Sequence, residues 1–171
     1  MIIDGKAIVY NRDNINTDEI IPARYLSTSD PDQLASHCME DLDKEFLKTK
    51  KALAAEIMVT GSNMGCGSSR EHAPIAIKHA GIKAVVAPSY ARIFFRNAIN
   101  TGLAIFECKD PAFYKGVKHG DGLKIDADGG FIENMTAGKK YPIQKIPTFL
   151  QEIIGVGGLV PYAKALAKKT R

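Results

Sequence analysis

The sequence predicts an α/β fold with parallel strands in its middle and antiparallel or mixed strands added after it. Between residues 55 and 108, short apolar runs that suit strands alternate with segments that suit helices. The links between them are short, which favours parallel strands joined by right-handed crossovers. After Pro111, glycines divide the chain into short pieces. The 171 residues, 45% of them hydrophobic and 25% charged, suit a single domain over 1–171.

The N-terminal part is expected to hold one strand and one helix. Residues 2–10 form the strand, and the Asn- and Asp-rich segment 11–18 a turn or loop. Asp30 offers a capping oxygen and Pro31 suits the first helical position, so a helix begins there. It is expected to reach about Lys48, because apolar residues recur at helical spacing at Leu34, Cys38, Leu42 and Phe46.

In the alternating region and the C-terminal part, strands and helices are predicted from apolar runs and from the residues that begin or end them. Strands are expected at 55–60, 82–87, 103–108, 123–126 and 131–136. Helices are expected from a little after Arg70 to Ala80, then at 90–100, 147–154 and 162–168. Ser89 is the expected cap of the helix at 90–100, and Gly102 its stop.

Charge and hydropathy exclude several classes of protein. The net charge is only +4, from 23 basic and 19 acidic residues, and the one dense basic cluster is at 164–171. A dedicated nucleic-acid-binding protein usually shows a broader basic patch, so no nucleic-acid partner is expected. No apolar run approaches the ~20 residues of a membrane span, so no membrane partner is expected either.

The cysteines indicate a reducing, cytoplasmic location. Cys38, Cys66 and Cys108 are odd in number and far apart. Neither a disulfide framework nor a metal site held by this chain alone is supported by such spacing. The first residues also lack the basic start and long apolar core of a signal peptide.

The segment 61–69 (GSNMGCGSS) is the most informative stretch. It is a polar, glycine-rich loop between a predicted strand and a predicted helix, which is where open α/β sheets bind ligands. Ser68 and Ser69 are expected near the helix start, where free N–H groups and the helix dipole favour an anion. Arg70 adds a cation whose fork shape suits a carboxylate. Together these residues predict a carboxylate or phosphate cradle.

Three well-known loop motifs are absent from this stretch. The Walker loop, the dinucleotide fingerprint and the hydrolase elbow each require a residue that is missing here. Cys66 with His72 nearby leaves a cysteine hydrolase open. A stand-alone anion-binding module, or a plain tight turn with a serine cap, also remains open.

Three blocks resemble the aconitase superfamily. The segment 65–74 (GCGSSREHAP) resembles its GSSREH signature, 89–103 (SYARIFFRNAINTGL) a second block, and 16–22 (NTDEIIP) followed by 24–26 its N-terminal block. The blocks occur in the family's order. The length and start are similar to those of the free-standing small subunits of isopropylmalate dehydratases, which implies a swivelling β/β/α three-layer domain with a parallel or mixed sheet.

The resemblance implies a hydro-lyase that moves a hydroxyl between adjacent carbons by dehydration and rehydration. Ser68 matches the family's serine base and Arg70 its carboxylate clamp, while Ser69 would cap the helix or stabilise the alkoxide. Asn97 and Asn100 would bond to backbone beside the loop. In the family a 4Fe–4S cluster takes part, and this chain has no ligand block for it. The resemblance therefore implies no cofactor on this chain and a cluster on a separate large subunit, its partner.

The segment after the first block resembles the family's specificity loop. Substrate contacts are expected at Arg24, Ser27 and Thr28. Homoaconitase-type small subunits tend to carry an arginine where Ser27 stands, and an extra carboxylate buried without a cation would be costly. The resemblance therefore favours isopropylmalate, in leucine biosynthesis. Homoaconitate, citramalate and dimethylmalate are the alternative substrates.

Overall fold

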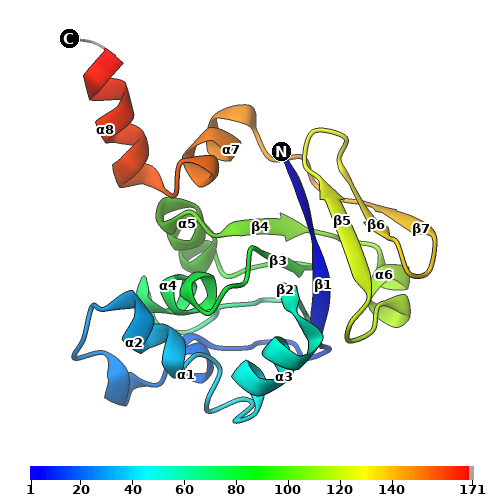
Figure 1. Ribbon diagram of the computed structural model, residues 1–171, viewed down its shortest axis with the longest axis horizontal. Coiled ribbons are helices and arrows are strands. Elements are labelled where there is room, and N and C mark those ends of the chain that lie inside the picture. The colour runs from blue at the N-terminus through cyan, green and yellow to red at the C-terminus, as the bar shows by residue number, and fades with distance from the viewer. Residues whose placement is uncertain (170–171) are drawn as a thin grey trace.

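The computed structural model describes residues 1–169, which form a curled seven-stranded sheet flanked by helices (Figure 1). The strand order is β4-β3-β2-β1-β5-β6-β7. The strands are β1 (Ile2–Tyr10), β2 (Ala55–Thr60), β3 (Ala84–Ala87), β4 (Ala104–Glu107), β5 (Gly122–Asp126), β6 (Phe131–Asn134) and β7 (Lys139–Pro142). The helices are α1 (Thr17–Ile20), η1 (Ala23–Tyr25, a 3-10 turn), α2 (Pro31–Ser36), α3 (Phe46–Leu53), α4 (His72–His79), α5 (Arg92–Thr101), α6 (Pro111–Gly116), α7 (Thr148–Gly155) and α8 (Leu159–Lys169).

The parallel half of the sheet brings four strand ends to one edge. Strands β1 to β4 are parallel and adjacent in chain order. Crossovers of one hand that always step in the same direction put their helices on one face of the sheet. Figure 1 shows α4 and α5 beside these strands. The carboxyl ends of β1 to β4 therefore share one edge, and the glycine loop at 61–69 starts there.

Strand β1 joins the parallel half to an antiparallel half. Its first part pairs with β5 antiparallel, from Ile2 opposite Asp126, and its second part pairs with β2 parallel, up to Tyr10 opposite Thr60. The pairing with β2 shifts register between Lys6 and Ala7. Strands β5, β6 and β7 continue as an antiparallel meander that runs across the direction of β2 to β4 (Figure 1). The predicted fold class, with its mixed sheet, is confirmed.

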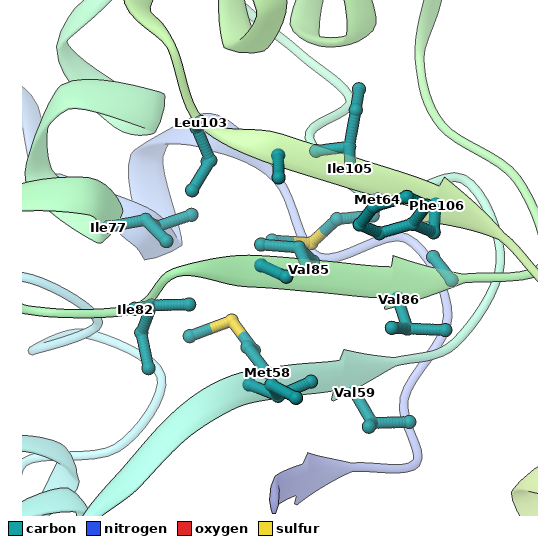
Figure 2. Close-up of a cluster of buried hydrophobic side chains, with 14 of the residues drawn as sticks. Met58, Val59, Met64, Ile77, Ile82, Val85, Val86, Leu103, Ile105 and Phe106 are labelled. Atoms are coloured by element: carbon teal, nitrogen blue, oxygen red, sulfur yellow. The ribbon is translucent and has the colours of Figure 1, made fainter. Parts of the chain in front are cut away.

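The core lies between the parallel strands and the helices that cover them. Figure 2 shows apolar side chains of β2, β3 and β4 with Ile77 of α4 among them. Met64, which comes from the glycine loop, is 1% exposed and belongs to the same cluster as Val85 and Phe106. The side chain of Met64 therefore anchors the loop in the core.

The helix predicted from Pro31 to Lys48 is wrong, because the structure divides it into α2 and α3. The chain turns after Ser36, and Met39 has a positive φ of 64°. Its N–H donates to the carbonyl of Ile20 at 2.7 Å. The apolar residues that suggested one helix are buried or half-buried all the same. Their spacing reflects burial by two short helices and the turns between them.

Several smaller predictions also need correction. The segment 11–18 was expected to be a loop, but α1 begins at Thr17. Ser89 does not cap α5: Ala91 is the N-cap, and the Ser89 hydroxyl accepts a hydrogen bond from the N–H of Asn63 at 2.9 Å. Gly102 ends α5 at a φ of 78°, as predicted. The elements α6 and β7 were not predicted.

The C-terminal helix α8 extends away from the body of the molecule (Figure 1). It begins at Leu159, before the expected start, and Pro161 falls in its first turn, where proline is tolerated. Of the basic cluster at 164–171, Lys164 and Lys168 are exposed, and 170–171 lie outside the described residues. Among residues 1–169, no helix is both long and apolar enough to cross a membrane.

Candidate functional site

The glycine loop between β2 and α4 is shaped by two glycines with positive φ. Gly65 has a φ of 76°, and a Cβ placed there would lie 2.1 Å from Cγ of Phe94. Gly67 has a φ of 98°. Residues that carry a Cβ atom rarely adopt such positive φ values, whereas glycine adopts them readily. The two glycines thus allow the loop to pass close to α5 and then turn toward α4.

The loop is held on one side by the segment that precedes α1. The N–H of Gly65 donates to the carbonyl of Ile15, and the N–H of Thr17 donates to the carbonyl of Cys66, both at 2.8 Å. On the other side, the N–H of Met64 donates to the carbonyl of Ser89 at 3.1 Å. These bonds fix the backbone of the loop to two segments that are distant in sequence.

Ser68 is positioned by Thr17. The Ser68 N–H donates to Oγ1 of Thr17 at 3.0 Å, and Thr17 is 2% exposed. Thr17 is the first residue of α1, whose N-cap Asn16 forms a capping box with Glu19. The capping box fixes the start of α1 and hence the threonine that holds the serine. The Ser68 residue itself is half-buried at the surface.

Arg70 is positioned by the next residue of α1. Its Nη1 donates to Oδ1 of Asp18 at 2.6 Å, with the Arg70 side chain 33% exposed and that of Asp18 57% exposed. The ion pair is accessible to solvent, so it orients the guanidinium at little gain in stability. The remaining N–H groups of the fork can face a bound carboxylate.

Ser69 is held by α5 and does not cap α4. The Nδ2 of Asn97, which is 4% exposed, donates to the carbonyl of Ser69 at 2.9 Å, as predicted for Asn97. Helix α4 begins only at His72, and its N-cap is Glu71. The expectation that Ser69 caps the helix is therefore wrong. Ser68, Ser69 and Arg70 lie on the loop just ahead of the helix.

Cys66 and His72 do not form a nucleophile–base pair. The Cys66 thiol donates to the carbonyl of Asn14 at 3.4 Å. The Nδ1 atom of His72 is buried and has no hydrogen-bond partner among the described residues. A cysteine nucleophile needs a base within hydrogen-bond reach, so this geometry does not favour a cysteine hydrolase.

The residues of the predicted specificity loop follow α1 directly. Arg24 lies in η1, and its guanidinium forms a two-bond ion pair with Asp41 at 2.7 and 3.0 Å. Hydrogen bonding to Arg24 lowers the pKa of the Asp41 carboxyl. Ser27 is exposed, and Oγ1 of Thr28 accepts the N–H of Asp30 at 3.1 Å. Helix α1 thus connects the two groups of predicted residues, with its start at the glycine loop and its end just before η1.

The described residues do not fit an iron–sulfur cluster. Within 1–169, no three His, Cys, Asp or Glu side chains are arranged to hold a metal ion. Cys38 and Cys108 are buried in the core, and Cys66 lies on the glycine loop. Cluster ligation uses several cysteine thiolates around one site.

Sequence reasoning missed Thr17 and Asp18 as site residues. Both lie in the segment that was expected to be a loop, and both hold a predicted site residue. A signal was present, because an Asn followed three residues later by a Glu is the pattern of a capping box. Asn16 and Glu19 make that box. It would have predicted a helix start at Thr17.

Fold and site together define a class of protein: an α/β domain that presents a serine and an arginine from a glycine loop at the carboxyl edge of a parallel sheet. Residues 3–111 match the aconitase C-terminal domain family. The chain is 56% identical over 168 residues to the 3-isopropylmalate dehydratase small subunit of Moorella thermoacetica, covering 98% of each chain. It is 53% identical over 169 residues to that of Caldicellulosiruptor bescii, covering 99% of each.

A solved structure agrees with these relatives. The crystal structure of 3-isopropylmalate dehydratase from Methanocaldococcus jannaschii is similar with a TM-score of 0.88 and 44% identity, over 99% of this chain and 98% of that one. The chain belongs to the 3-isopropylmalate dehydratase small subunits of the aconitase family.

Proposed function

We propose that this chain supplies the base and a carboxylate clamp to a hydro-lyase that interconverts 2-isopropylmalate and 3-isopropylmalate in leucine biosynthesis. One observation carries the proposal: two segments that are far apart in sequence, α1 and α5, converge on Ser68–Arg70. Thr17 and Asp18 hold Ser68 and Arg70, and Asn97 holds Ser69. A plain turn with a serine cap needs no such support from two other segments.

In the proposed reaction, Ser68 Oγ takes the proton from the carbon next to a carboxylate. The hydroxyl on the adjacent carbon leaves, and a double bond forms between the two carbons. Addition of water with the opposite placement of hydroxyl and hydrogen gives the isomer. A serine is a weak base in water, so its alkoxide must be stabilised by donors and positive charge that are already in place. Arg70 provides that charge and clamps a substrate carboxylate.

The proposed partner is a separate large subunit that carries the 4Fe–4S cluster. On this chain the site is open, because Ser69 and Asp18 are exposed. Elimination chemistry of this kind requires a site that excludes bulk water. A partner that closes over the glycine loop would exclude it. We also propose a single domain over 1–171 and a cytoplasmic location, which suits three free cysteines.

The proposed substrate class follows from the loop after η1. Ser27 and Thr28 offer hydroxyls but no cation, and the guanidinium of Arg24 already pairs with Asp41. A malate with an apolar substituent leaves no charge to be neutralised there, whereas an additional carboxylate would need a cation. We therefore propose that Ser27 and Thr28 contact the substituent and that Arg24 acts mainly by holding their loop.

The experiment combines this chain with the large subunit of the same organism, with its cluster reconstituted, and measures turnover of 2-isopropylmalate, citramalate, dimethylmalate and homoaconitate. We expect activity only when both chains are present, and the highest kcat/KM on 2-isopropylmalate. Ser68→Ala should lower kcat by about 1000-fold or more, since loss of a catalytic base removes most of the rate. Ser36→Ala, an exposed serine of α2, is the matched control and should change nothing.

Three results would count against the proposal. Turnover by Ser68→Ala at the wild-type rate would remove the base assignment. Preference for homoaconitate over 2-isopropylmalate would overturn the assignment of substrate class while leaving Ser68 in place. Tight binding of a carboxylate by the isolated chain in calorimetry would favour the stand-alone anion-binding module.

A further inference from the structure

A cluster of five side chains joins the two ends of the segment that carries Ser27 and Thr28. We call Arg24, Tyr25, His37, Glu40 and Asp41 the Glu40 cluster. The rings of Tyr25 and His37 are stacked, with centroids 3.6 Å apart and an interplanar angle of 6°. Tyr25 lies just before the segment and His37 just after α2. The stack therefore closes the chain between them into a loop.

Glu40 is the hydrogen-bonding centre of this cluster. Its Oε2 lies 2.7 Å from Nδ1 of His37, and its Oε1 accepts from the Tyr25 hydroxyl at 3.0 Å. The same Oε1 accepts from Nη2 of Arg24 at 3.1 Å. One carboxylate thus ties three side chains from both ends of the loop.

Arg24 completes the cluster from the outer side. Its guanidinium carbon lies 4.7 Å from the centroid of the Tyr25 ring, which is a cation–π distance. Its two-bond pair with Asp41 uses the fork geometry that a lysine could not reproduce. Exposed single ion pairs contribute little, but several charges in a network with good geometry hold a conformation more firmly. The cluster therefore has the geometry to hold the loop before any partner arrives.

The Glu40 cluster flanks the segment that carries Ser27 and Thr28, so it can affect how these two residues are placed. Between Tyr25 and α2, the chain is fixed locally by Thr28, which accepts the N–H of Asp30, and by Asp30, which caps α2. Ser27 is exposed and is not part of a helix or strand. Its placement depends on how firmly the ends of the loop are held.

We propose that Glu40 is a positioning residue that sets the loop carrying Ser27 and Thr28, and so governs which substituent on the malate is accepted. This inference rests on the proposed function, in which those two residues contact the substituent. Glu40 acts through Tyr25, Arg24 and His37 and makes no substrate contact. Pre-ordering of a binding loop lowers the entropy lost on binding, so its removal should appear in KM rather than in kcat.

The first test needs no activity. Amide hydrogen exchange of residues 23–29 is compared in the wild-type chain, Glu40→Ala and Glu40→Gln. Glu40→Ala should speed exchange in this segment by about tenfold, while segments in β2 and β3 stay unchanged. Glu40→Gln keeps an acceptor for Tyr25 and Arg24, so it should restore most of the protection. Equal exchange in wild type and Glu40→Ala would overturn the proposal, whatever the enzyme's substrate.

The second test uses the two-subunit enzyme. With Glu40→Ala, KM for 2-isopropylmalate should rise about tenfold, with kcat within about twofold of wild type. The kcat/KM preference for 2-isopropylmalate over citramalate should fall, and Glu40→Gln should restore it. Glu45→Ala is the matched control, because it breaks another exposed ion pair, with Lys48, and should leave both constants unchanged.

The outcomes separate this inference from the proposed function. Inactivity of the wild-type complex on all four substrates would contradict the proposed function, and the exchange result would still decide whether Glu40 holds the loop. Wild-type activity with an unchanged KM and unchanged preference in Glu40→Ala would overturn the role of Glu40 alone. An equal loss of kcat in Glu40→Ala and Glu40→Gln would also overturn it, since that pattern indicates a direct catalytic role.

Discussion

The backbone N–H of Ser68 donates to the hydroxyl oxygen of Thr17 at 3.0 Å, although the two residues are 51 positions apart in the chain. The next residue of the helix, Asp18, holds Arg70 at 2.6 Å. One turn of helix thus orients both of the residues that we propose to act on the substrate. The short helix α1 is as much a part of the site as the glycine loop.

Replacement of Thr17 by valine should impair catalysis more than folding. Valine has nearly the same shape but offers no acceptor, so the Ser68 N–H loses its partner. A hydrogen bond of this kind contributes about 1 kcal/mol to stability. A small displacement of the base should lower kcat of the two-subunit enzyme by about 10- to 100-fold. Thr17→Ser keeps the acceptor and should retain most of the activity; steady-state kinetics and thermal unfolding measure both effects.

Replacement of Arg70 by lysine should weaken substrate binding despite the retained charge. A lysine can still pair with Asp18, but it cannot donate two parallel hydrogen bonds to a carboxylate. Loss of one such bond corresponds to about a tenfold rise in KM. The measurement is KM for 2-isopropylmalate, with Arg96→Lys on the exposed face of α5 as the control. An unchanged KM would show that Arg70 does not clamp the substrate.

Comparing alanine variants at Gly65 and Gly138 distinguishes the cost of a steric clash from the cost of backbone strain. Both have positive φ, 76° and 63°, but an added Cβ meets Phe94 at 2.1 Å in the first case and nothing within 4 Å in the second. Gly138→Ala should therefore cost about 1 kcal/mol, from strain alone. Gly65→Ala should cost about 3 kcal/mol or more, because Phe94 or the loop must move. Urea unfolding measures the free energy of unfolding of both variants. An equal loss in the two would contradict this prediction.

The three cysteines should differ sharply in reactivity. Burial raises the pKa of the Cys38 and Cys108 thiols, so little reactive thiolate forms on either. Cys66 lies on the glycine loop and is partly exposed. Under native conditions iodoacetamide should modify Cys66 first, as peptide mass spectrometry can show. Modification of Cys38 at a comparable rate would indicate that α2 and the turn after it open readily.

The loop at 23–29 should resist mild acid and loosen in stronger acid. The pKa of the Glu40 carboxyl is lowered, first by hydrogen bonding to His37 and then by Tyr25 and Arg24; that of Asp41 is lowered by Arg24, with Lys44 adding to the effect. A carboxyl group whose pKa is lower in the folded chain than in the unfolded chain stabilises the fold at every pH above its unfolded-state pKa. That stabilisation is lost as the pH falls through the pKa of the group in the folded chain. Exchange protection of 23–29 should thus persist from neutral pH to about 4.5 and then decline. A decline that begins near pH 6 would contradict the assignment of this effect to the Glu40 and Asp41 carboxyl groups.

Much of the fold could be predicted from local patterns. The strands at 2–10 and 55–60 and the end of α5 at Gly102 match the structure because apolar runs and glycine stops act locally. The helix predicted over 31–48 is wrong, because apolar spacing records which side chains are buried, and two short helices bury them as well as one. Strand β7 (KKYP) buries one side chain, Tyr141, so its sequence carries little periodic signal.

The sequence by itself determined which residues the candidate site is built from. Its residue types and their order in three blocks indicated a serine, an arginine and an aconitase-type loop. Only the tertiary structure decided how those residues are held: Thr17 on Ser68, Asp18 on Arg70, and Glu40 on the loop after η1. No local pattern links the segments in contact. The first two contacts exist because parallel strands bring distant loops to one edge of the sheet, and the third lies within the single connection between β1 and β2. The proposed role of Arg24 also changed, since its ion pair with Asp41 becomes visible only once the chain is folded.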